Sequence, residues 1–233
     1  MEQVVDEDAE VILLGNVFDD AIPATATSRD FLQAEVQFRK DLHRDIADGR
    51  LDMPFATFII TAEYFHLSRS LLVLGRQPSF TLEEAMARYN DRLSRVVEGL
   101  PKEIDGYSLI MILQRYAENK FYPGNGSGML LDSLFHFQND CEGGTKEILA
   151  YLQALYPALH LGSNRGMLQT TTGEFIGHMQ AFIGPGPAVG KIIENDRGLI
   201  VETTRVSFDS VLPYQSGDVF PLEDFVVRYY PDV

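Results

Sequence analysis

The stretch of sequence that decides the fold is DCEGGTKEILAYLQALYP, which runs from Asp140 to Pro157. Its apolar residues recur at helical spacing up to the proline, which predicts one helix that begins at or just after Cys141. The chain before this helix has the periodicity of helices, whereas the chain after it has alternating or β-branched segments. The sequence therefore predicts an α+β fold in which the cysteine helix packs against a small antiparallel sheet.

Four helices are expected in the first half of the chain. An amphipathic helix is predicted over residues 28–48, and a more apolar, largely buried one over residues 54–74. Thr81 and Glu84 form a capping-box pattern, which predicts the start of a third helix. A fourth helix is expected over about residues 107–119.

The segment from residue 122 to residue 128 separates the two halves, because its glycines and its proline favour turns. We expect a mainly helical region over residues 1–122 and a core over residues 123–233, packed together as one compact unit. The second half is expected to form strands over residues 160–169, 174–183 and 198–206.

Composition and charge restrict the classes of function. The chain has 233 residues, 45% of them hydrophobic and 23% charged, which is typical of a globular protein. Its 34 acidic and 19 basic side chains give a formal charge of -15, which repels nucleic-acid phosphates and anionic lipid surfaces. We therefore expect neither a nucleic acid nor a membrane as partner. The acidic start of the chain and the lack of a long apolar stretch predict a cytoplasmic location.

Cys141 is the only cysteine of the chain, so the chain alone offers no disulfide, zinc finger or iron–sulfur ligation. We predict no metal and no cofactor. At the start of a helix, backbone N–H groups and the helix dipole stabilise a thiolate, whereas the adjacent acids Asp140 and Glu142 oppose one. The alternative interpretation is a small core residue, because cysteine is often buried.

A histidine and a carboxylate follow Cys141 in the order that thiol chemistry uses. His178 lies in the second predicted strand and Glu202 in the third. If these strands are neighbours, both side chains can lie side by side on the face that meets the cysteine helix. The imidazole would then take the thiol proton, and the carboxylate would orient the imidazole. The alternative for His178 is a hydrogen-bonded strand residue without a catalytic role.

This order of residues resembles the core of the transglutaminase-like fold, which belongs with the papain-like cysteine peptidases. The resemblance covers residues 122–205: a cysteine opens a helix after a Gly-rich loop, a strand contains Gly-His, and a later strand ends in an acid and Thr-Thr. It implies that Cys141 is the nucleophile, His178 the base and Glu202 the third member. The family more often has Asp at the third position and an aromatic residue near the histidine, and this chain has no tryptophan. Asp196 is the alternative third member.

The resemblance implies cysteine-dependent acyl transfer on a peptide or protein amide through a thioester, with hydrolysis expected over transamidation. The backbone N–H of Cys141 and the side-chain amide of Gln138 or Asn139 would hold the oxyanion. Loop capping is the alternative role of both amides. Two other functions stay open: a catalytically inactive member of the fold that binds proteins, and an unrelated helical and β domain with an incidental cysteine.

Overall fold

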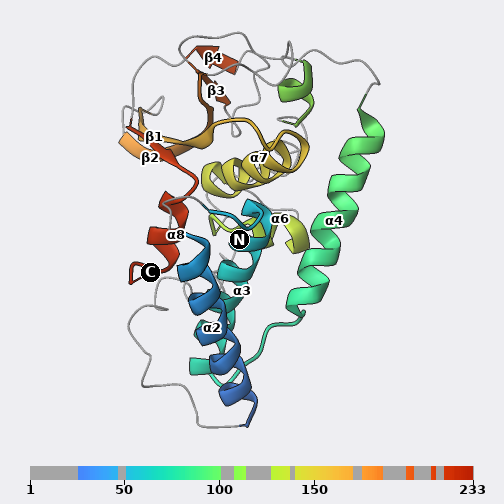
Figure 1. Ribbon diagram of the computed structural model, residues 1–233, viewed down its shortest axis with the longest axis vertical. Coiled ribbons are helices and arrows are strands. Elements are labelled where there is room, and N and C mark those ends of the chain that lie inside the picture. Colours follow the sequence, from blue (N-terminus) through green and yellow to red (C-terminus); the bar gives the residue numbers. More distant parts are fainter. Residues whose placement is uncertain are drawn as a thin grey trace, which may run out of the picture.

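One helix, α7 (Cys141–Leu155), lies between a layer of helices and a five-stranded antiparallel sheet (Figure 1). This arrangement confirms the predicted α+β class. The computed structural model describes residues 26–46, 51–100, 108–113, 127–136, 140–169, 175–185, 198–201, 211–213 and 218–232.

Three long helices form the helical layer: α2 (Ala26–Asp45), α3 (Phe55–Val73) and α4 (Leu82–Gly99). The predicted capping box at the start of α4 is confirmed. The backbone N–H of Thr81 donates to the Glu84 carboxylate at 2.8 Å, and the Glu84 N–H donates to the Thr81 hydroxyl at 3.2 Å. Residues 108–113 are also helical, within the range expected for the fourth helix.

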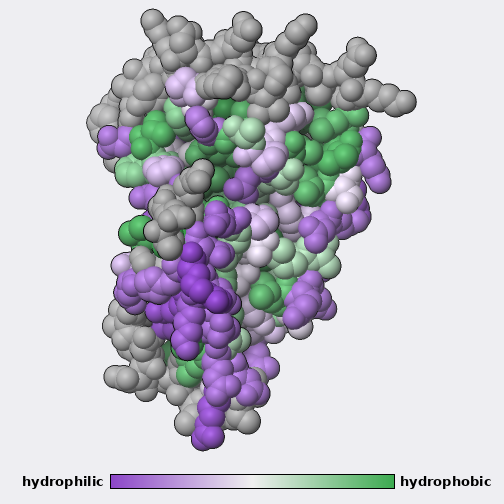
Figure 2. Space-filling model, in the orientation of Figure 1, coloured by the Kyte–Doolittle hydropathy of each residue, from purple (hydrophilic) through white to green (hydrophobic). Residues whose placement is uncertain are grey.

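The two helices α2 and α3 differ in how much of their surface is buried. Figure 2 shows hydrophilic side chains along α2, whose outward face carries the exposed Arg29, Lys40 and Arg44. Most of α3 is buried, and Phe58 and Ile59 have no exposed surface. No helix in the described part of the chain is long and apolar enough to cross a membrane.

The sheet has the strand order β4-β3-β2-β1-β5, and all of its neighbours are antiparallel. The predictions of the first two strands are confirmed, and the third is confirmed over its first part. β2 and β3 are neighbours, which is the condition on which the sequence argument for His178 and Glu202 depended, and Ala181 lies opposite Val201. The bounds of the strands are β1 (Leu161–Gln169), β2 (Phe175–Ile183), β3 (Leu199–Val201), β4 (Val211–Pro213) and β5 (Asp218–Pro221).

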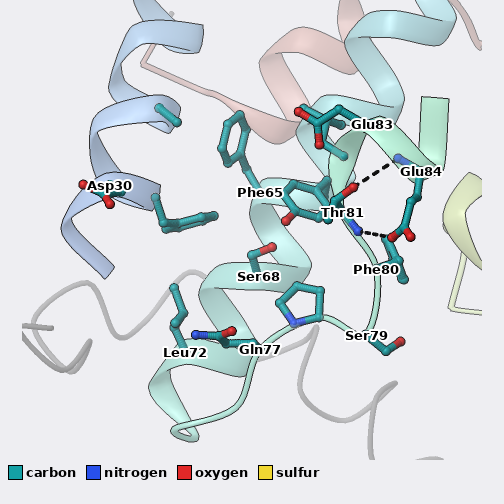
Figure 3. A pocket seen from close by; sticks show the side chains of 15 residues that line it. Asp30, Phe65, Ser68, Leu72, Gln77, Ser79, Phe80, Thr81, Glu83 and Glu84 are labelled. Carbon is teal, nitrogen blue, oxygen red and sulfur yellow. Dashed lines mark hydrogen bonds between the residues drawn. The ribbon is translucent and has the colours of Figure 1, made fainter. Parts of the chain in front are cut away.

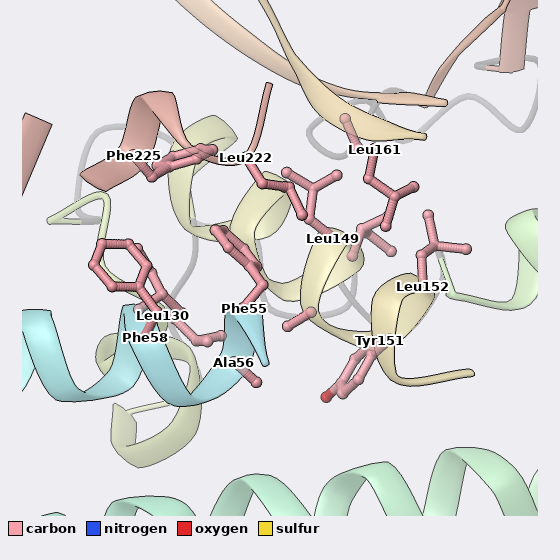
Figure 4. Close-up of a cluster of buried hydrophobic side chains, with 14 of the residues drawn as sticks. Phe55, Ala56, Phe58, Leu130, Leu149, Tyr151, Leu152, Leu161, Leu222 and Phe225 are labelled. Carbon is pink, nitrogen blue, oxygen red and sulfur yellow. The ribbon is translucent and has the colours of Figure 1, made fainter. Parts of the chain in front are cut away.

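A continuous hydrophobic core joins the helical layer to the sheet through α7. Leu149 and Leu152 of α7 are buried in one cluster with Phe55 of α3 and Leu161 of β1 (Figure 4). Burial of each such side chain contributes about 1.5–3 kcal/mol. The core therefore crosses the boundary expected near residue 122, because α3 and α4 pack against the second half of the chain.

Four short elements have no counterpart in the sequence predictions: α6 (Leu130–His136), β4, β5 and α8 (Asp224–Tyr229). They contain seven, three, four and six residues. Such lengths give too few repeats for a periodic apolar pattern. Two of them, α6 and α8, flank the end of α7 that carries Cys141.

Candidate functional site

Cys141 is the first residue of α7, as the sequence predicts. The helix is capped by Asp140, whose carboxylate accepts a hydrogen bond from the Gly143 N–H at 2.8 Å. The cysteine is partly buried and packs against the hydrophobic core. Because Asp140 satisfies one backbone donor of the first turn, its carboxylate is committed to the helix cap.

Glu142, the second acid beside Cys141, is held by two cations. Its carboxylate lies 2.9 Å from the Lys146 ammonium and 3.2 Å from the Arg228 guanidinium. Burial alone would raise the pKa of Glu142, but Lys146 and Arg228 hold it below the ordinary value. The negative charge beside Cys141 is thus balanced by the positive charges of α7 and α8.

Lys146 is almost fully buried, with 1% of its side chain exposed, and its ammonium is fully engaged. It donates to the Glu63 carboxylate at 3.0 Å, the Gly128 carbonyl at 2.6 Å and the Tyr229 hydroxyl at 2.7 Å. Burial disfavours the charged form, but the nearby carboxylates of Glu142 and Glu63 raise the pKa of Lys146 well above its ordinary value. The ammonium therefore stays charged at neutral pH.

Glu63, the carboxylate partner of Lys146 on α3, also contacts α6. Its carboxylate accepts hydrogen bonds from the backbone N–H groups of Leu130 and Leu131, each at 3.0 Å, and from the Tyr229 hydroxyl at 3.1 Å. It thereby satisfies donors at the N-terminus of α6. We call Glu63, Glu142, Lys146, Arg228 and Tyr229 the ionic cluster; it joins α3, α6, α7 and α8 around the start of α7.

His178 lies in the middle of β2, opposite Gly166 of β1. The burial of β2 alternates: Met179, Ala181 and Ile183 belong to the core that includes α7. Side chains of successive strand residues point to opposite faces, so His178 lies on the face away from α7. The register therefore places His178 on the face of the sheet opposite to the one that packs against α7, the helix of Cys141.

The face of the sheet that carries His178 is polar next to the histidine. Asn164 and Gln180, directly opposite each other on β1 and β2, are joined there by a hydrogen bond of 2.9 Å. β3 ends at Val201, one residue before Glu202. Four predicted site residues lie outside the described part of the chain: Gln138, Asn139, Asp196 and Glu202.

The described part of the chain encloses two main cavities, and neither is lined by Cys141 or His178. The larger, of about 1160 Å³, lies between the start of α3, α4 and the C-terminal half of α7, and its lining includes Tyr89 and Gln153. It lies at the other end of α7 from Cys141. The smaller, of about 510 Å³, lies between α2, α3 and residues 77–84. Among the residues that the structure describes, no group of three His, Cys, Asp or Glu side chains could hold a metal ion.

The sequence analysis missed the ionic cluster. One signal was present: Lys146 stands three residues before Leu149, on the apolar side of the predicted helix. A lysine in such a position is almost never fully buried unless it has a partner, so it points to a buried carboxylate. The other members have no sequence signal, because Glu63 and Tyr229 each lie 83 residues from Lys146 and Arg228 lies 86 residues from Glu142.

Comparison with protein-family models, curated proteins and solved structures gives no match for this chain.

Proposed function

We propose that this protein is a cysteine-dependent acyl-transfer enzyme of the transglutaminase-like type, with Cys141 as the nucleophile. The observation that supports the proposal is the placement of Cys141 as the first residue of a helix that packs against the sheet. The positive end of the helix dipole favours a thiolate at this position. The sequence analysis expected Asp140 and Glu142 to oppose a thiolate. In the structure Asp140 caps the helix, and the charge of Glu142 is balanced by Lys146 and Arg228.

The proposed reaction has two steps. The Cys141 thiolate attacks the carbonyl carbon of a peptide or protein amide, the C–N bond breaks, and the amine leaves with a proton from the protonated base. Water then attacks the thioester carbon, and the acyl group leaves as a carboxylate while the thiol is restored. In this proposal the backbone N–H of Cys141 stabilises the oxyanion of both tetrahedral intermediates. Water as acceptor makes the protein a hydrolase.

His178 is the proposed base and Glu202 its proposed orienting acid, with Asp196 as the alternative. For this role the His178 segment of β2 must turn its imidazole toward α7. Two glycines surround the histidine: Gly177 precedes it, and Gly166 is its cross-strand partner. Glycine inside a strand weakens it and permits a bulge, and a shift of one residue moves a side chain to the other face. The proposed reaction therefore requires a bulged form of β2 at His178, which differs from the regular pairing of β1 and β2 in this structure.

Acylation by p-nitrophenyl acetate, followed by intact-mass analysis, tests the nucleophile. We expect a single acetyl group on the parent protein that neutral hydroxylamine removes, since hydroxylamine cleaves thioesters and leaves acetyl-lysine intact. Cys141→Ala should lack this adduct, and Asp132→Asn, which changes a side chain on α6, should retain it. Hydrolysis of a peptide mixture by the parent but not by Cys141→Ala would complete the assignment. An adduct that persists in Cys141→Ala would contradict it.

The second candidate function is a catalytically inactive protein-binding module of the same fold. The alternation of burial along β2 favours it, because it separates His178 from the face that packs against α7. In that case His178→Ala should leave the reaction rate of Cys141 with electrophiles unchanged. The proposed enzyme predicts a clear decrease in the same variant.

A further inference from the structure

The smaller cavity has features of a ligand site that the proposed reaction does not use. It has a volume of about 510 Å³, within the range of small-molecule pockets. Figure 3 shows side chains of α2, α3 and the segment before α4 around it. Its apolar walls include Phe31 and Phe65, whose rings meet edge to face at 5.4 Å, and Phe80, whose ring centre lies 6.1 Å from that of Tyr64.

Ser68 provides a polar group inside the apolar walls. Only 2% of this residue is exposed, it lines the cavity, and its hydroxyl has no hydrogen-bond partner within the described part of the chain. Figure 3 shows its oxygen on the side of α3 that faces residues 77–81. Ser70, two residues later, donates to the His66 carbonyl at 3.0 Å instead. A buried hydroxyl without a partner is unfavourable, and a ligand with a polar group at this point would satisfy it.

The charge of the lining is entirely negative. Asp30 and Glu83 are exposed carboxylates, and none of the 15 lining residues is basic. Glu84 also lines the cavity, but its carboxylate accepts from the Thr81 N–H in the capping box. Aromatic faces and carboxylates both attract an organic ammonium group and repel an organic anion.

We propose that this cavity binds a small arylalkyl ammonium ion that carries a hydroxyl group on its ring. The ring lies between the aromatic walls, the hydroxyl forms a hydrogen bond with Ser68, and the ammonium lies on the side of the cavity where Glu83 is found. This site is separate from Cys141, so the proposed ligand binding does not depend on the proposed acyl transfer.

Titration calorimetry of the full chain with three probes tests the class of ligand. Tyramine has both polar groups, phenethylamine lacks the hydroxyl, and 3-(4-hydroxyphenyl)propanoate reverses the charge. We expect tyramine to bind about fivefold more tightly than phenethylamine, the effect of one net hydrogen bond, and at least about tenfold more tightly than the anion. Equal affinities for the cation and the anion would overturn the proposal.

Variants locate the site. Ala34 is exposed and lines the cavity, so Ala34→Trp should fill it and abolish tyramine binding. Gln33→Trp, the same change at the preceding exposed residue, should leave binding unchanged. Ser68→Ala should reduce the preference for tyramine over phenethylamine to about one, because the hydroxyl then has no partner. Unchanged tyramine binding in Ala34→Trp would place the ligand elsewhere and overturn the proposal, and Cys141→Ala should bind as the parent does.

Discussion

The two ends of α7 are held in place by different forces. At the C-terminal end, Leu149 and Leu152 pack with Phe55 and Leu161 in the hydrophobic core. At the N-terminal end, the buried Lys146 holds carboxylates, a backbone carbonyl and a tyrosine hydroxyl through directed contacts of 2.6–3.0 Å. Apolar contacts tolerate small shifts, whereas hydrogen bonds and ion pairs lose strength when their geometry changes.

The difference matters because the candidate nucleophile lies at the polar end. The hydrophobic core determines that α7 packs between the sheet and the helices. The ionic cluster and the Asp140 cap determine where its first turn, and therefore Cys141, lies relative to α6 and α8. Changes at the two ends should therefore have separable effects on stability and on the reactivity of the thiol.

Lys146→Met should have the largest effect on stability. The methionine fills a similar volume but leaves the Glu63 carboxylate buried without its cation, which costs about 3–5 kcal/mol. Urea unfolding followed by circular dichroism measures the loss. The matched control is Lys40→Met, an exposed residue of α2 that should change stability by less than about 0.5 kcal/mol. A loss of less than about 1 kcal/mol in Lys146→Met would show that the ionic cluster does not hold α7.

Leu149→Ala tests the apolar end. Leu149 has no exposed surface, so the truncation should lower the free energy of unfolding by about 2–4 kcal/mol through lost burial and a new cavity. The alkylation rate of Cys141 in the folded variant should equal that of the parent, because the polar end is unchanged. The exposed Leu32→Ala is the control. A changed alkylation rate would contradict the separation of the two ends.

Asp140→Ala removes the cap of α7 and should lower stability by about 1 kcal/mol. Asp140→Asn keeps an oxygen that can accept from the Gly143 N–H and should retain most of the stability. Thermal unfolding of both variants compares them at equal concentration. If both lose the same stability, the charge at this position matters and the hydrogen bond does not.

Glu142→Gln should have the smallest effect, visible in the dependence of stability on pH. Lys146 and Arg228 hold the pKa of Glu142 below its ordinary value in the folded protein, so the unfolded chain binds more protons in mild acid. The stabilisation is therefore complete above the unfolded pKa and is lost as the pH falls through the folded pKa. Between about pH 5 and about pH 3, the variant should lose less stability than the parent. Parallel urea curves over this range check the sign.

The sequence was sufficient for the elements that have a strong local signal. The capping pattern at Thr81 and Glu84 located the start of α4, and the apolar period up to Pro157 located α7. The pairing of β2 with β3 was only a condition of the sequence argument, and the structure fulfils it. The short α6 and α8 could not be predicted, because they are stabilised by tertiary contacts such as the Glu63 carboxylate at the start of α6.

The candidate site was predictable only in its residue types. Cys141 and its place in the helix follow from local pattern, but the side of β2 that carries His178 depends on the register and on which face packs against α7. The sequence also showed the two acids beside the thiol, Asp140 and Glu142. It did not show that Lys146 and Arg228 bind Glu142. Arg228 comes from 86 residues later in the chain, and no local rule connects it with Glu142.

The most direct test of the central claim is the rate of alkylation of Cys141 by iodoacetamide as a function of pH, in the parent and in His178→Ala. Because the chain has one cysteine, every thiol adduct reports on Cys141. A thiolate–imidazole pair predicts that the parent is alkylated rapidly already at neutral pH, and that the variant reacts rapidly only at alkaline pH. Identical profiles in the two proteins, or alkylation only after denaturation, would contradict the proposed enzyme.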